Sequence, residues 1–132
     1  MIALVKVKDV MIKEVITIDE GESVAKACEI MGEKHIGSLI VLRQGKPIGI
    51  FTERDLLSKI IPKRLKLDEV KIKDYMSTPL TVISSEFDLK EAARIMSQLK
   101  IRRLPVIEGE KLVGILTSAD IIHALAKAPL EF

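Results

Sequence analysis

The sequence predicts an α+β fold: two tandem β-α-β-β-α repeats packed as a pseudo-twofold pair with mixed sheets. Three observations lead to this prediction. Residues 49–55, Gly-Ile-Phe-Thr-Glu-Arg-Asp, return at 114–120 as Gly-Ile-Leu-Thr-Ser-Ala-Asp. The same offset of 65 residues holds without a gap over residues 7–60. Each copy alone would also be marginally stable, because a domain of roughly 60 residues buries only about 60% of its unfolded surface. We therefore expect repeat 1 at 1–65 and repeat 2 at 66–132, forming one compact module.

The elements of the first copy follow from its apolar spacing. Residues 7–11 are irregular or briefly helical, and the β-branched run at 15–18 predicts a strand. Ser23 is a suitable N-cap for a helix whose apolar face holds Val24, Ala27, Cys28 and Met31 at helical spacing. The remaining elements are a strand at 39–42, a turn at 43–47, a strand at 48–51 and a helix from 52 to about 61 that Pro62 ends.

The second copy repeats this order. Asp88 and Glu91 have the spacing of a capping box and predict the start of its first helix. Its other elements are strands at 80–83, 103–107 and 112–116 and a last helix at 118–127. The first helix of each copy is long enough to join two parallel strands, and the next two strands form an antiparallel hairpin. These connections predict a mixed sheet in each copy.

Composition limits the kind of protein and its compartment. The net charge of +2 is too small to indicate a nucleic-acid or anionic membrane partner. A single cysteine, Cys28, excludes an intramolecular disulfide and fits a reducing compartment. The longest apolar runs have the length of a strand, and the first residues lack the pattern of a signal peptide. We expect a soluble, cytoplasmic protein.

Several short motifs recur in both copies in the same order. They are Asp-Val-Met at 9–11 and Asp-Tyr-Met at 74–76, helices that contain Met31 and Met96, Leu-Ile-Val at 39–41 and Leu-Pro-Val at 104–106, and a closing Gly-x-x-Thr-x-x-Asp at 49–55 and 114–120. With these motifs in this order, the chain resembles a tandem pair of CBS domains, and the resemblance covers nearly the whole chain. This pair, the Bateman module, takes its name from cystathionine β-synthase.

The resemblance implies a regulatory module that binds AMP, ADP, ATP or S-adenosylmethionine in two clefts between the repeats, with no obligatory cofactor. Each cleft would combine the first strand and the segment before the second strand of one copy with the closing Thr and Asp of the other. The first predicted cleft holds Ile16, Gly37, Ser38, Leu39, Thr117 and Asp120. The second holds Thr81, Arg102, Arg103, Leu104, Thr52 and Asp55. The family's Asp accepts hydrogen bonds from the ribose, and its modules commonly form homodimers through their helices and act on a regulated partner protein.

The residues themselves are consistent with this function. A carboxylate accepts hydrogen bonds only, which suits a vicinal diol, and a strand-to-helix junction favours an anion. Arg102 and Arg103 could meet phosphate, whereas Gly37 and Ser38 stand at the same place in the first copy, so we expect unequal clefts. Two alternatives remain open: Thr-x-x-Asp is also the spacing of a helix cap, and the repeated Gly49 and Gly114 could serve a bulge or close packing.

Other functions have less support. The sequence holds no nucleophile with a matched base and no Gly-rich phosphate loop, so we expect no enzyme. His35 and His123 lack partners at metal-ligand spacing, so we expect no metal site. A nucleic-acid-binding protein would rest on the basic residues of 63–73 and 102–103, but aromatic residues for base stacking are scarce. An NAD or S-adenosylmethionine sensor and a purely structural dimerisation module are the further alternatives.

Overall fold

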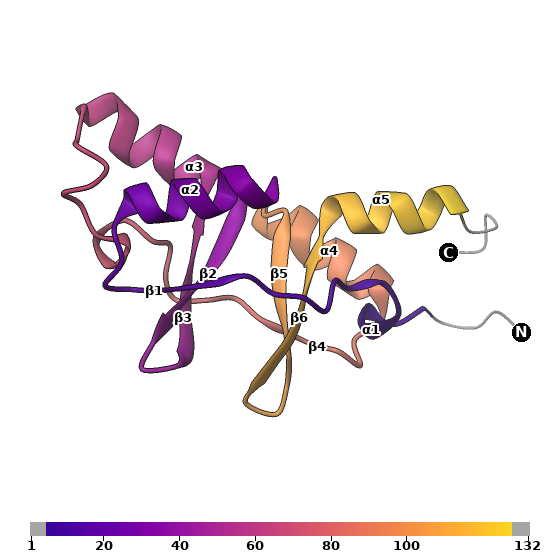
Figure 1. Ribbon diagram of the computed structural model, residues 1–132. Coiled ribbons are helices and arrows are strands. Elements are labelled where there is room, and N and C mark those ends of the chain that lie inside the picture. The colour runs from indigo at the N-terminus through magenta and orange to yellow at the C-terminus, as the bar shows by residue number, and fades with distance from the viewer. Residues whose placement is uncertain (1–4, 128–132) are drawn as a thin grey trace, which may run out of the picture. The chain divides into compact units, whose positions relative to one another are not determined.

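The structure, a computed structural model, describes residues 5–127 and shows the predicted order of elements in each copy (Figure 1). The first copy comprises α1 (Val7–Val10), β1 (Thr17–Asp19), α2 (Val24–Lys34), β2 (Ser38–Arg43), β3 (Lys46–Thr52) and α3 (Glu53–Asp55). The second comprises a 3₁₀ turn (Ile72–Asp74), β4 (Ile83–Ser84), α4 (Leu89–Leu99), β5 (Arg103–Glu108), β6 (Lys111–Thr117) and α5 (Ser118–Lys127). Residues 1–4, on which part of the signal-peptide argument rests, lie outside the described range.

Each copy forms one mixed sheet of three strands, which confirms the predicted fold class. In the first copy β1 lies parallel to β2, and β2 pairs antiparallel with β3. The second copy repeats this arrangement with β4, β5 and β6. The hairpin register places Ser38 opposite Thr52 and Arg103 opposite Thr117, so the two hairpins are equivalent residue by residue.

Three local predictions were wrong in detail. The helix after Thr52 is not a regular α-helix, because α3 continues as a π-helical segment (Leu56–Ile60) and a 3₁₀ turn (Ile61–Lys63). Pro62 within that turn has no N–H to donate, which interrupts the helical hydrogen bonding near the end of the segment. The strand expected at 80–83 shrinks to β4, because only Ile83 and Ser84 find partners on β5.

The third difference concerns the start of α4. Asp88 caps the helix as predicted, but its side chain accepts from the N–H of Lys90 at 3.2 Å. The carboxylate of Glu91 pairs instead with Arg94 at 3.2 Å, one helical turn further on. The expected reciprocal capping box is therefore replaced by a single cap from Asp88 and an ion pair of Glu91 with Arg94.

The chain divides into two compact units whose bounds differ from those of the sequence repeat. Of the described residues, one unit contains residues 16–80, and the other contains residues 5–15 with 81–127. We call residues 5–15 and 66–80 the leader segments. Val7, from the leader of the first copy, lies in the core of the second copy, whereas its repeat partner Ile72 lies in the core of the first. Each sheet and its helices therefore pack around an apolar side chain from the leader that precedes the other copy.

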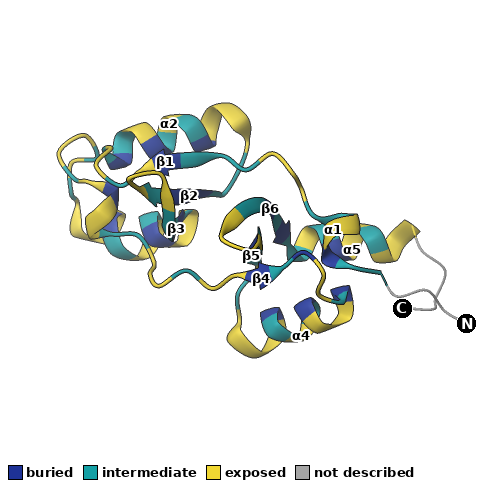
Figure 2. Ribbon diagram, turned by 90° about the horizontal axis from the view of Figure 1, so that it is seen from below, coloured by how far each residue is buried: buried dark blue, intermediate teal, exposed yellow. Residues whose placement is uncertain are grey.

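Most other core residues are equivalent at the 65-residue offset, but Ile60 and Ile121 are not, because their repeat partners Leu125 and Leu56 are exposed and half-buried. Both side chains are buried in the pairs Ile18/Ile83, Val24/Leu89, Ala27/Ala92, Met31/Met96, Leu39/Leu104, Val41/Val106 and Phe51/Leu116. In α2 and α4 these residues recur on one face, as Figure 2 shows by the dark blue segments of both helices. The apolar helix faces predicted from the sequence are thus confirmed as core faces.

The leader segments also complete the hydrogen bonding of the helices. The first N–H groups of a helix have no partner within it and need an outside acceptor. In α2, the N–H groups of Val24 and Ala25 donate to the carbonyls of Val70 and Leu67 at 2.9 and 2.8 Å. In α4, the N–H of Leu89 donates to the carbonyl of Val5 at 2.8 Å.

Gly49 and Gly114 let the leader segments pass close to the hairpins. A Cβ on Gly114 would lie 2.6 Å from the sulfur of Met11 and 2.9 Å from the carbonyl oxygen of Ile12. A Cβ on Gly49 would lie 2.8 Å from the carbonyl oxygen of Ser77 and 3.0 Å from the sulfur of Met76. The structure shows both roles that the sequence left open for these glycines, because the leader passes close to each one and the register of each hairpin shifts beside it.

We predict that Gly114→Ala destabilises the protein by about 1–3 kcal/mol, the usual cost of overpacking. Denaturant unfolding measures this loss. Gly32→Ala is the matched control, because nothing lies within 4 Å of its Cβ position in α2, and it should raise the free energy of unfolding by roughly 0.5–1 kcal/mol. Equal stability of Gly114→Ala and the wild type would contradict the close packing.

An ion-pair cluster fastens the first leader to its unit. Lys6 and Lys8 place their ammonium groups 2.6 and 2.8 Å from the carboxylate of Glu86. Their hydrogen bonds and charges lower the pKa of Glu86 from its ordinary 4.5 to about 2. A carboxylate with a lowered pKa in the folded state favours folding above its unfolded pKa, and this contribution is lost as the pH falls through the folded pKa.

The wild type should therefore lose part of its stability between about pH 4.5 and pH 2 through Glu86. Glu86→Gln should lack this part of the acid dependence, so its stability should change less over that interval. Unfolding curves measured across this pH interval check the prediction. Glu110→Gln is the control, because Glu110 is also an exposed glutamate. Identical acid slopes for the wild type and Glu86→Gln would show that the cluster does not stabilise the fold.

Candidate functional site

The closing motif of each copy forms a reciprocal cap between a strand and a helix. In the first copy, the N–H of Thr52 donates to Oδ2 of Asp55 at 2.9 Å, and the N–H of Asp55 donates to Oγ1 of Thr52 at 3.4 Å. In the second copy, Thr117 and Asp120 form the same two bonds at 2.9 and 3.1 Å. The capping alternative is thus realised in both copies. A cap of this kind holds one carboxylate oxygen and fixes the direction of the other.

The segment before each hairpin lies beside the closing motif of its own copy. The carbonyl of Gly37 accepts a hydrogen bond from the N–H of Glu53 at 3.0 Å, and the carbonyl of Arg102 accepts one from Ser118 at 2.9 Å. The structure thus brings Gly37 and Ser38 next to Thr52, and Arg102 and Arg103 next to Thr117. The combination of each segment with the closing motif of the other copy, as in the two predicted clefts, stays a prediction.

The other predicted site residues differ in what they could offer a ligand. Leu39 and Leu104 are completely buried in the cores, so only their backbone could face a ligand. Ile16 is half-buried, and its carbonyl accepts a hydrogen bond from Ile40 at 3.2 Å. Thr81 is exposed and precedes β4. Arg102 is exposed beside the start of α5, where an anion could reach it.

Sequence reasoning missed two residues that contact a site carboxylate. Lys59 lies 2.7 Å from Oδ1 of Asp55, and the hydroxyl of Ser77 donates to the same oxygen at 2.9 Å. The helical i, i+4 spacing of Asp55 and Lys59 could have indicated the first contact. Nothing local in the sequence indicates the second, because Ser77 belongs to the leader segment that packs on this unit.

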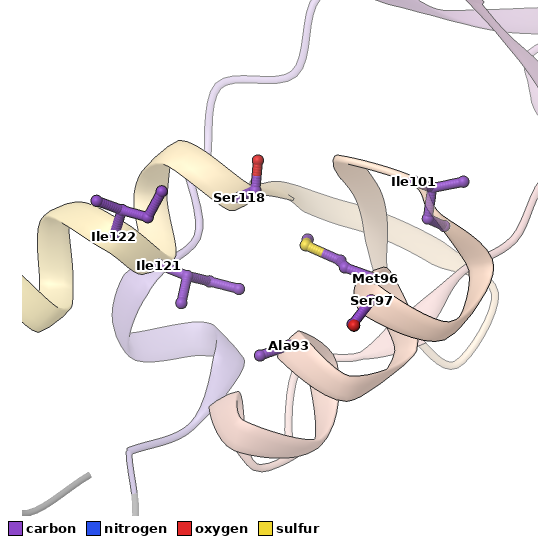
Figure 3. Close-up of a pocket in the computed structure, with 7 residues that line it drawn as sticks. All are labelled: Ala93, Met96, Ser97, Ile101, Ser118, Ile121 and Ile122. Carbon is purple, nitrogen blue, oxygen red and sulfur yellow. The ribbon is translucent and has the colours of Figure 1, made fainter.

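A shallow, open depression of about 280 Å³ lies between α4 and α5 (Figure 3). It is lined by Ala93, Met96, Ser97, Ile101, Ser118, Ile121 and Ile122. The lining is mainly apolar and holds no charged side chain, so it suits an apolar group better than a phosphate. Ser118 borders this depression and also follows Thr117 of the closing motif.

Three further features of the described residues bear on function: the Cys28 thiol, possible metal ligands and possible membrane spans. Burial raises the pKa of the half-buried Cys28 thiol, which disfavours the reactive thiolate. Within residues 5–127, no three His, Cys, Asp or Glu side chains gather as metal ligands would. No helix in that range is both long and apolar enough to cross a membrane.

Two mixed sheets, each with a capped Thr-x-x-Asp motif and a leader from the other copy, define a tandem module of two equivalent units. The sequence pattern of the CBS domain matches residues 7–62 and again 72–127, so the chain belongs to the CBS-domain family. The family resemblance inferred from the repeated motifs is thereby confirmed. CBS pairs are generally regulatory modules that sense ligands, commonly adenine nucleotides or similar compounds.

Known proteins similar to this chain support the assignment. An uncharacterized protein of Methanocaldococcus jannaschii is 35% identical, over 92% of this chain and 32% of its own length. An uncharacterized protein of Methanopyrus kandleri is 37% identical, over 90% of this chain and 62% of its own. The chain thus spans less than two-thirds of either relative. A hexameric CBS-CP12 protein from bloom-forming cyanobacteria is 30% identical with a TM-score of 0.86, covering 98% of this chain and 78% of that one.

Proposed function

We propose that this CBS pair is a cytoplasmic regulatory module that binds an adenine nucleotide (AMP, ADP or ATP) and signals its presence to a partner protein. The observation that supports this function best is the environment of Asp120. Its cap holds Oδ2, and the side chain is only half-buried, so Oδ1 is placed to accept hydrogen bonds from a ribose diol. The adjacent start of α5 favours the phosphate of the same ligand.

The proposed mechanism is a shift between two states of the module. A ligand changes such an equilibrium only if it binds the two states with unequal affinity. The nucleotide would stabilise the state in which the closing motif and the segment before the hairpin both contact it. The partner protein would then recognise that state, so the regulated property is the association of this module with its partner.

Thermal unfolding with AMP, ADP, ATP, S-adenosylmethionine, NAD and a single-stranded oligonucleotide tests the ligand class. A ligand at 100 times its dissociation constant adds about 2.7 kcal/mol of stability, which raises the melting temperature by several degrees. We expect this increase with at least one of AMP, ADP and ATP. Asp120→Ala should reduce the increase, with its own melting temperature as the reference. The absence of any increase with adenosine compounds at millimolar concentration would contradict the proposal.

We also propose that two copies associate through the helical segments that follow the closing motifs. CBS-pair proteins often form oligomers. The inner face of each segment is occupied, since Ile60 and Ile121 lie in the cores. The outer faces remain apolar, with Leu57 65% and Ile122 66% exposed. A second copy presents the same apolar faces and could cover them, as a self-complementary twofold interface requires.

Replacement of these outer residues should weaken self-association without loss of fold. We expect the wild type to have the mass of a dimer by light scattering, and Leu57→Glu with Ile122→Glu to shift the mass towards the monomer. Phe87→Glu is the matched control, because Phe87 is also exposed and apolar but lies outside both helical segments. A wild type that keeps the mass of a monomer at the highest protein concentration measured would contradict the proposed interface.

A further inference from the structure

The two closing motifs are alike in sequence, but their carboxylates have different surroundings. Both oxygens of Asp55 are engaged within its unit. Oδ2 accepts from the N–H of Thr52 at 2.9 Å, whereas Oδ1 accepts from the hydroxyl of Ser77 at 2.9 Å and lies 2.7 Å from the ammonium of Lys59. The residue is also only 3% exposed.

Asp120 has the cap but not these other donors. Its Oδ2 accepts from the N–H of Thr117 at 2.9 Å, and no donor to Oδ1 is found among residues 5–127. The repeat explains the difference, because the offset of 65 residues aligns Lys59 with Ala124 and Ser77 with Ile12. Neither an alanine nor an isoleucine side chain can donate a hydrogen bond.

Lys59 and Ser77 also hold the leader on this unit. The ammonium of Lys59 donates to the carbonyl of Tyr75 at 3.1 Å, and Ser77 exchanges two backbone hydrogen bonds with Ile50. A ribose that displaced these donors from Asp55 would break charge-assisted hydrogen bonds to a buried carboxylate and loosen the leader. A ribose at Asp120 displaces no protein donor from Oδ1.

We infer that Asp120 alone accepts the ribose diol, and that Asp55 is a structural carboxylate held by Lys59 and Ser77. The inference rests on the proposed adenine-nucleotide function and sharpens it. Of the two predicted clefts, the one with Thr117 and Asp120 recognises ribose, and the one with Thr52 and Asp55 has no ribose acceptor. The chain therefore binds one nucleotide with selectivity for the 2′-hydroxyl.

Calorimetric titration of the full chain with AMP and ATP and with their 2′-deoxy analogues tests this inference. We expect one ribonucleotide per chain, bound at least tenfold more tightly than its 2′-deoxy analogue. Asp120→Asn should remove this preference. Asp55→Asn should lower the melting temperature and retain the preference, an outcome that separates a structural role from contact with ribose.

Two results would overturn the inference and leave the proposed function intact. One is the binding of two nucleotides per chain with equal preference for the 2′-hydroxyl. The other is loss of the preference in Asp55→Asn rather than in Asp120→Asn. If the wild type bound none of the adenosine compounds, the proposed function itself would fail, and the inference with it.

A second variant tests the role of the two donors directly. Lys59→Ala combined with Ser77→Ala removes both donors from Asp55 and gives position 59 the residue that the second copy has at 124. If the variant keeps the circular dichroism spectrum of the wild type, we expect a second site that prefers the ribonucleotide. A folded variant that still binds a single nucleotide would overturn the role assigned to Lys59 and Ser77.

Discussion

Each half of this protein depends on an apolar side chain that its own helices and hairpin do not supply. Val7 completes one core and Ile72 the other, and each comes from the leader segment that precedes the opposite copy. A core this small loses stability steeply when one buried aliphatic side chain is missing. The need to seat the leader explains other features of the fold, including the glycines beneath it and the helix N–H groups that donate to its carbonyls.

The same packing connects the fold to the candidate site. Each leader crosses its hairpin through a short backbone pairing, Ile12 with Ile115 in one unit and Ser77 with Ile50 in the other. The closing Asp follows the last strand of that hairpin, so the residue that the leader places there decides what the carboxylate meets. Where it is Ser77, the carboxylate gains a donor, and where it is Ile12, it gains none. A residue that has a packing role thus also sets the chemistry of the site.

The sequence predicted what depends on local spacing and on the repeat. Ser23 caps α2 as expected, α5 has its expected bounds, and the strand pairings follow from the order of elements. The sequence did not predict which leader packs on which copy, because residues 7 and 72 occupy equivalent positions of the repeat and no local pattern assigns either to a core. For the same reason, the contact of Ser77 with Asp55 could not be predicted. The irregular helix at 53–63 was also missed, since apolar spacing does not distinguish α from π turns over so few residues.

The two copies keep one Thr-x-x-Asp motif although their carboxylates have different surroundings. A cap needs one carboxylate oxygen and one backbone N–H, and both copies keep these bonds. The second oxygen is not required for the cap, so a change around it alters ligand contact without loss of the helix start. Lys59 and Ser77 in the first copy are such a change, and they convert the second oxygen into an anchor for the leader. Persistence of the motif in a CBS repeat is therefore evidence for a helix cap, and the donors around the second oxygen decide whether that Asp can also bind ribose.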